Sequence, residues 1–135
     1  MSQERHRVTV SVLGEIDIAS APPLERMLRE LAAEGCGLLE VDLDGVEFMD
    51  SSIVKLLLRT LTYLEHEDAC LRVRCSAPTH RRIFRLTSTD ELLNVTASQP
   101  ATAAPSQEAG SRHYLFDSRT SSMTLPRPRE VCRTV

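Results

Sequence analysis

The chain has 135 residues, of which 41% are hydrophobic and 26% are charged. This length predicts one globular domain that is large enough to bury a core without disulfides or metal ions. The net charge is −3 with no long run of one sign, which argues against direct nucleic-acid binding because such proteins normally carry a basic patch. No apolar run approaches the roughly 20 residues that a membrane helix needs, so no membrane segment is expected.

The N-terminus and the cysteines indicate a cytoplasmic protein. The opening sequence MSQERHRVTV lacks the apolar segment of a secretory signal. Cys36, Cys70, Cys75 and Cys132 form no CxxC pair, and no histidine stands at zinc-finger spacing. We therefore expect no metal site and no other cofactor, and we interpret the cysteines as reduced thiols.

Apolar residues alternate between strand and helix periods up to Thr96. The expected elements, in chain order, are a strand at 8–12, a helix between Ser20 and Gly35, a strand at 39–43, a helix at 53–64, a strand at 71–75, a short helix after Pro78 and a strand or turn at 92–95. Strands that alternate with helices predict an α/β fold with crossover helices packed on a sheet. In the helix at 53–64, we expect Leu57 and Leu61 to be buried against that sheet.

The composition changes after Thr96. Residues 97–135 are rich in Ser, Thr, Ala and Pro and have no sustained apolar period. Such a segment cannot bury enough apolar surface to offset its ordering entropy. We therefore predict a domain at residues 8–96 and a disordered tail at 97–135. The one apolar patch of the tail, HYLF at 113–116, is either a chance cluster or a short docking motif.

The stretch EFMDSSIVKLLL places an acid and two serines where a strand gives way to a helix. Asp50 can cap free backbone N–H groups, and Ser51 and Ser52 then fall in the first helical turn. Donors and dipole at a helix start favour negative charge by about 0.3–1 kcal/mol. The fold would therefore tolerate a phosphate on Ser51, although capping alone also explains these residues.

A nucleophilic serine is a second interpretation of the same stretch. Hydrolases place such a serine in a G-x-S-x-G turn, but Met49 and Ile53 stand at the glycine positions around Ser51. The nearby His66 and His80 have no obvious orienting acid. The residues therefore disfavour an enzyme.

Three stretches of the chain resemble the STAS domain, and within it the anti-anti-sigma factors, also called anti-sigma factor antagonists. GEIDIASAPPLERML resembles the family segment that leads into the first helix. VDLDGVEFMDSSIVKLLL resembles the family signature, and LRVRCSAPTHRRIFRLTSTDELLNV resembles the closing strand, helix and final segment. Together these stretches cover roughly residues 8–95, so the STAS fold is expected.

The resemblance implies a regulatory binding protein. In the family, the unphosphorylated antagonist binds an anti-sigma factor that is also a serine kinase, and this releases a sigma factor. The kinase then phosphorylates the serine directly after the motif acid, and a phosphatase resets the antagonist. That serine matches Ser51, and the resemblance places Asp17, Asp50, Ser52 and Ile53 with it in the partner-binding surface. The alternative is a STAS scaffold or transporter-complex subunit without a switching serine.

The chain departs from the family pattern in three places. Ile53 and Ser88 stand where the family often has glycine, and a β-branched residue does not permit the close backbone approach that glycine allows. The side chain of Ile53 either packs inward or obstructs the approach of the kinase to Ser51. The seven residues before Val8 barely supply the extra N-terminal strand that is usual in the family. Either that edge strand is missing or the chain starts late, and an uncovered edge would leave backbone groups open to pairing.

Overall fold

The computed structural model describes residues 6–97, 111–119 and 122–124. The elements are β1 (His6–Ile16), α1 (Ala21–Ala33), β2 (Cys36–Met49), α2 (Ser52–His66), β3 (Cys70–Arg74), α3 (Pro78–Leu86), β4 (Val95–Thr96), β5 (Ser111–Asp117) and β6 (Ser122–Thr124). The order of strands and helices predicted up to Thr96 is confirmed. Within the described ranges, no helix is both long and apolar enough to cross a membrane.

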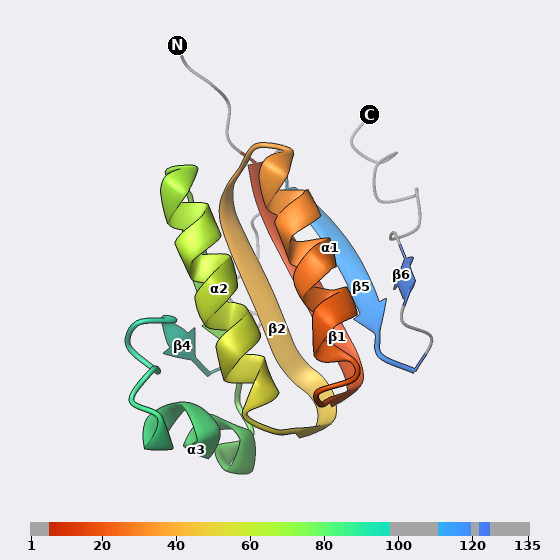
Figure 1. Cartoon of the computed structure of the whole chain (residues 1–135), viewed down its shortest axis with the longest axis vertical. Coiled ribbons are helices and arrows are strands. Elements are labelled where there is room, and N and C mark those ends of the chain that lie inside the picture. Colours follow the sequence, from red (N-terminus) through yellow and green to blue (C-terminus); the bar gives the residue numbers. More distant parts are fainter. Residues whose placement is uncertain (1–5, 98–110, 120–121, 125–135) are drawn as a thin grey trace.

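One mixed sheet organises the fold, with the strand order β4-β3-β2-β1-β5-β6. The pairs β1–β2, β2–β3, β3–β4 and β1–β5 are parallel, whereas β5–β6 is antiparallel. Helices α1 and α2 lie side by side on one face of this sheet (Figure 1). This is the α/β sheet with crossover helices that the sequence predicts.

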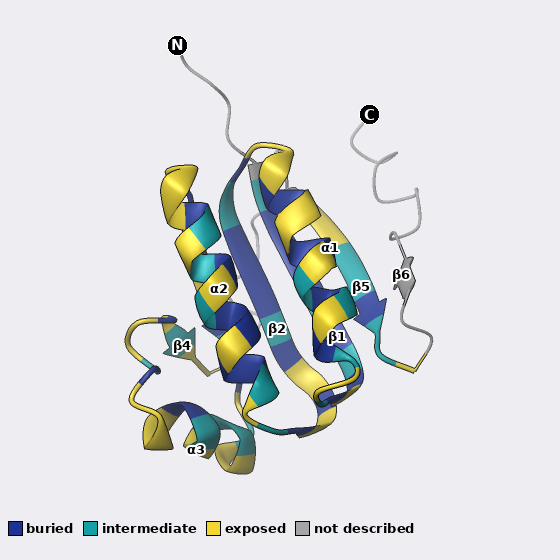
Figure 2. Ribbon diagram, in the orientation of Figure 1, coloured by how far each residue is buried: buried dark blue, intermediate teal, exposed yellow. Residues whose placement is uncertain are grey.

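The core lies between these two helices and the sheet (Figure 2). The buried stripe of α2 runs through Ile53, Leu57, Thr60 and Leu64, all of which are fully buried. Leu57 is therefore buried as predicted. Leu61 lies at the margin of this stripe and is only partly buried, so the prediction that it is buried is wrong.

A strand from the C-terminal part of the chain pairs with the edge of β1 that β2 leaves open. Strand β5 pairs with β1 from Arg7↔Ser111 to Leu13↔Asp117, and the side chain of Phe116 is only 2% exposed. The predicted disorder therefore does not hold for residues 111–119, because β1 supplies hydrogen-bonding partners and the core accepts Phe116. The rest of the predicted tail, at 98–110, 120–121 and 125–135, lies outside the described residues.

Ser88 follows α3 in a left-handed backbone conformation, with a φ of 59°. Its N–H donates to the carbonyl of Arg85 at 3.1 Å, which closes the end of the helix. This conformation costs a residue with a side chain about 1–2 kcal/mol. The backbone conformation therefore explains why the family pattern often has glycine where this chain has Ser88.

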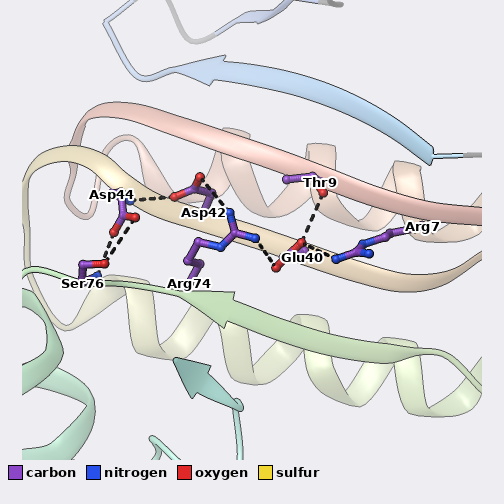
Figure 3. Close-up of polar contacts among 7 residues, drawn as sticks. All are labelled: Arg7, Thr9, Glu40, Asp42, Asp44, Arg74 and Ser76. Atoms are coloured by element: carbon purple, nitrogen blue, oxygen red, sulfur yellow. Dashed lines mark hydrogen bonds and ion pairs between the residues drawn. The ribbon is translucent and has the colours of Figure 1, made fainter. Parts of the chain in front are cut away.

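A polar network occupies the face of the sheet away from α1 and α2 (Figure 3). Its centre is Glu40, which is 2% exposed and accepts a hydrogen bond from Arg74 at 2.8 Å. Arg7 Nη2 and Thr9 Oγ1 each lie 3.4 Å from the other carboxylate oxygen. Because these donors satisfy a carboxylate that would be costly to bury alone, we interpret the network as structural.

Candidate functional site

The carboxyl ends of β1 and β2 bring the two predicted acids to one edge of the sheet. Ile16 and Met49 pair in register, and the N–H of Asp50 donates to the carbonyl of Ile16 at 3.1 Å. Asp17 and Asp50 therefore follow directly on paired residues of neighbouring parallel strands. This edge is a common location for functional groups in α/β sheets.

Asp50 performs the capping that the sequence predicts for it. Its Oδ1 accepts the N–H of Ser52 at 2.9 Å at the first turn of α2. Ser51 precedes the helix, its side chain makes no capping hydrogen bond, and the residue is exposed, whereas Ser52 is partly buried. Because Asp50 accepts the N–H of Ser52, the first turn of α2 does not depend on the Ser51 hydroxyl.

Asp17 is held in a tight loop between β1 and α1. Its Oδ1 accepts the N–H groups of Ser20 and Ala19, each at 3.0 Å, and lies 3.1 Å from the Ser20 hydroxyl oxygen. These hydrogen bonds, those of Ser20 foremost, lower the pKa of Asp17 below its ordinary value of 3.8. Asp17 is therefore a carboxylate at neutral pH, in a fixed orientation.

We expect the ionisation of Asp17 to contribute to the dependence of stability on pH. The pKa is lower in the folded than in the unfolded protein, so the stabilisation is present above the unfolded value and is lost as pH falls through the folded value. Asp17→Asn should remove this part of the acid dependence. Urea titrations from neutral pH to about pH 3 would measure it, with Glu67→Gln as a surface control. Parallel curves for wild type and Asp17→Asn would contradict the expectation.

Ile53 does not belong to this surface. Its side chain is fully buried in the core, and its N–H donates to the carbonyl of Asp50 at 3.1 Å. Of the two orientations that the sequence leaves open, the structure has the inward one, so the Ile53 side chain is not exposed for contact with a partner, whereas Ser51 is exposed. Ile53 lies on the same face of α2 as Leu57, four residues later, and both are buried against the sheet.

Two exposed apolar side chains lie close in sequence to the acids. Ile18, directly after Asp17, is 79% exposed, and Phe48, two residues before Asp50, is 52% exposed. Large apolar groups at a surface often mark an interaction site. Sequence reasoning did not assign either residue. Both stand at the end of a strand or just after it, where the alternation of buried and exposed side chains no longer predicts which side chain is buried.

A sequence profile of the family described as Mlab, STAS domain, matches residues 1–94. The anti-sigma-B factor antagonist of Staphylococcus aureus (strain NCTC 8325 / PS 47) is 31% identical over 86 residues, which cover 64% of this chain and 80% of that protein. The anti-sigma-B factor antagonist of Bacillus subtilis (strain 168) is 27% identical over 97 residues, covering 72% and 88%.

Solved structures have the same fold. An anti-sigma factor antagonist from Mycobacterium paratuberculosis superposes with a TM-score of 0.61 at 34% identity, over 70% of this chain and 80% of that one. The antagonist SpoIIAA in its unphosphorylated form gives a TM-score of 0.60 at 22% identity, over 75% and 89%. The Bacillus protein SpoIIAA in the phosphorylated form gives 0.56 at 20% identity, over 75% and 92%.

Proposed function

This chain belongs to the STAS domain family, and on that premise we propose that it is an anti-sigma factor antagonist controlled by phosphorylation of Ser51. In this proposal the unphosphorylated chain binds an anti-sigma factor that is also a serine kinase, and binding releases a sigma factor. Phosphorylation then ends the interaction, and a phosphatase restores it. The chain would act in the cytoplasm and would contact neither nucleic acid nor a membrane directly.

The observation that carries this proposal is the exposed hydroxyl of Ser51 at the start of α2. Capping falls to Asp50, which accepts the N–H of Ser52, so a phosphate on Ser51 would not remove a hydrogen bond that the helix needs. The positive end of the helix dipole also favours the added charge. The existence of SpoIIAA structures in both forms is consistent with a fold that accepts phosphate.

The charge of the surrounding edge explains why a partner would leave. Asp17, Asp50 and Glu15 lie at or next to the carboxyl ends of β1 and β2, whereas the charge of Glu47 at the end of β2 is paired with Arg119. A phosphate adds about −1.5 to −2 charges near neutral pH. In an interface from which water is excluded, like charges at close range cost several kcal/mol. The fold can therefore accept a phosphate that the complex cannot.

The same edge indicates the chemistry of the partner. Acidic groups favour a basic surface on the anti-sigma factor, and ionised Asp17 offers a fixed acceptor for it. Ile18 and Phe48 would lose water on binding, and buried apolar anchors dominate most interfaces. We therefore place Asp17, Asp50, Ser51 and Ser52 in the partner-binding surface and add these two apolar residues.

Phosphosite mapping tests the proposal. The full chain is incubated with ATP, Mg²⁺ and an anti-sigma factor kinase from the same genome, and modified residues are identified by mass spectrometry. We expect phosphate on Ser51 in the wild type and in Ser52→Ala, and none in Ser51→Ala. Phosphate only at other positions, or no modification at all, would instead favour a STAS scaffold or transporter-complex subunit without a switching serine.

A further inference from the structure

The end of β5 is fastened to the end of β1 by Ser118. The Ser118 N–H donates to the carbonyl of Leu13 at 3.1 Å, and its hydroxyl oxygen accepts the N–H of Glu15 at 2.8 Å. A residue of the C-terminal segment thus forms hydrogen bonds on both sides of Gly14. The contact at Glu15 lies two residues before Asp17.

Hydrogen bonds continue from this contact to the Asp17 loop. The carbonyl of Glu15 lies 2.8 Å from the hydroxyl of Ser20, which has one proton to donate. The Ser20 hydroxyl oxygen accepts the N–H of Asp17 at 2.9 Å, and the Ser20 N–H donates to the Asp17 carboxylate at 3.0 Å. Ser118, Glu15, Ser20 and Asp17 therefore form one connected hydrogen-bonded series.

Gly14 makes room for this contact. It has a φ of +93°, a conformation that residues with a side chain rarely adopt, and a Cβ placed on it would overlap the Ser118 hydroxyl. Glycine is therefore required at this position for two reasons: the backbone conformation disfavours any side chain, and a side chain would collide with the C-terminal segment. The contact of Ser118 with β1 is thus built into the sequence of both segments.

Arg119 makes a second connection, to the end of β2. Its Nη2 lies 3.2 Å from both carboxylate oxygens of Glu47, three residues before Asp50, and its N–H donates to the Asp117 carboxylate at 3.0 Å. Because both side chains of the ion pair are mostly exposed, the pair contributes little to global stability. Its location suits it to orienting the end of β2 instead.

We propose that Ser118 and Arg119 are positioning residues for the edge of the sheet that carries Asp17, Asp50 and Ser51. Ser118 holds the β1–α1 loop in which Asp17 lies. Arg119 holds the end of β2, which leads into Asp50 and Ser51. The C-terminal segment thereby maintains the binding-competent shape of the edge. The effect of this segment on affinity for an anti-sigma factor rests on the proposed function, whereas its effect on the two loops does not.

NMR spectroscopy of the full chain tests the effect on the loop without any partner. In Ser118→Ala, we expect the Glu15 amide to exchange about fivefold faster, because it loses one hydrogen bond. We also expect the pKa of Asp17 to rise toward 3.8, since the donors that lower it are less well held. Ser118→Thr keeps the hydroxyl and should retain both wild-type values. Unchanged exchange and an unchanged pKa in a folded Ser118→Ala would overturn the proposal.

Affinity for an anti-sigma factor from the same genome tests the effect on binding. We expect Arg119→Ala and Ser118→Ala to weaken binding about five- to tenfold, the loss of roughly one hydrogen bond or ion pair each. Arg112→Ala is the matched control, because Arg112 is another exposed arginine of the C-terminal segment, within β5 itself. Its carboxylate partner, Glu34 at 3.9 Å, lies beyond the end of α1 and away from the edge. This control should bind like the wild type.

The two measurements separate the failure of each idea. If the loop loosens but even the wild type does not bind the anti-sigma factor, the proposed function fails and the positioning of the loop stands. If the wild type binds and both variants bind equally well, the positioning role in recognition is overturned. An equal loss in Arg112→Ala would also overturn it, because that result would indicate a general effect of β5 on the sheet.

Discussion

Ser51→Asp is expected to weaken binding to the anti-sigma factor about a hundredfold while leaving the melting temperature within about a degree of the wild type. A hundredfold loss corresponds to about 2.7 kcal/mol, which is within the cost of placing like charges together in an interface. The new carboxylate would stand beside Asp50 and close in sequence to the acidic end of β2. Isothermal titration calorimetry and thermal unfolding of the same samples would measure both quantities.

Stability should hold because the substitution is made at an exposed helix start. Ser51 makes no capping hydrogen bond, and Asp50 keeps its contact with the N–H of Ser52. Negative charge at this position is favourable by about 0.3–1 kcal/mol. Affinity and stability should therefore separate, which a substitution that merely disrupts the fold would not produce.

Two further variants separate charge from size at this position. Ser51→Asn has nearly the shape of Ser51→Asp without its charge, and Ser51→Ala removes the hydroxyl. We expect both to bind within about threefold of the wild type, since neither adds a charge to the acidic edge. Equal weakening by Asn and Asp would show that the site excludes bulk at this position, and the electrostatic argument would then be wrong.

Local patterns were sufficient to predict most of the fold. The strand predicted at 8–12 lies within β1, and Asp50 indicated the start of α2. These features depend on neighbours in sequence, whose spacing fixes which side is buried. Periodicity could not predict that Leu61, at the edge of the buried face of α2, is only partly buried, because this depends on how the helix packs on the sheet.

The covering of the β1 edge could not be predicted in this way. Strand β5 is short, polar at its start and surrounded by disorder-like composition, and its stability depends on pairing with a strand about a hundred residues earlier. Phe116 is its one fully buried anchor among the described side chains of the strand. Local propensity is a weak guide where long-range pairing and burial decide the structure.

Sequence reasoning was only partly sufficient for the site. The resemblance singled out Asp17, Asp50 and Ser51 as a predicted site, and the parallel pairing of β1 with β2 explains why these residues share an edge. The contacts of Ser118 and Arg119 with the ends of β1 and β2 could not be predicted, because they arise from the placement of β5. The sequence left the direction of the Ile53 side chain open, and its burial agrees with the apolar phase of the helix.

The burial of Ile53 changes what a glycine at this position is expected to do. Removing a fully buried Ile side chain costs about 2–5 kcal/mol by cavity formation, and glycine in place of alanine adds up to about 1 kcal/mol in a helix. Because small domains are stable by only about 5–15 kcal/mol, Ile53→Gly should lose a large part of the total. Urea unfolding would measure this loss.

Ile53→Val provides the matched variant, because it keeps the core filled and should cost only about 0.5–1.5 kcal/mol. A side chain that faces the sheet cannot obstruct a kinase at Ser51. We therefore expect Ile53→Val to be phosphorylated at the wild-type rate when both proteins are folded. The opposite pattern would be faster phosphorylation of Ile53→Gly with unchanged stability. That result would mean that Ile53 faces the kinase in solution and that the phase of α2 at its first turn is wrong.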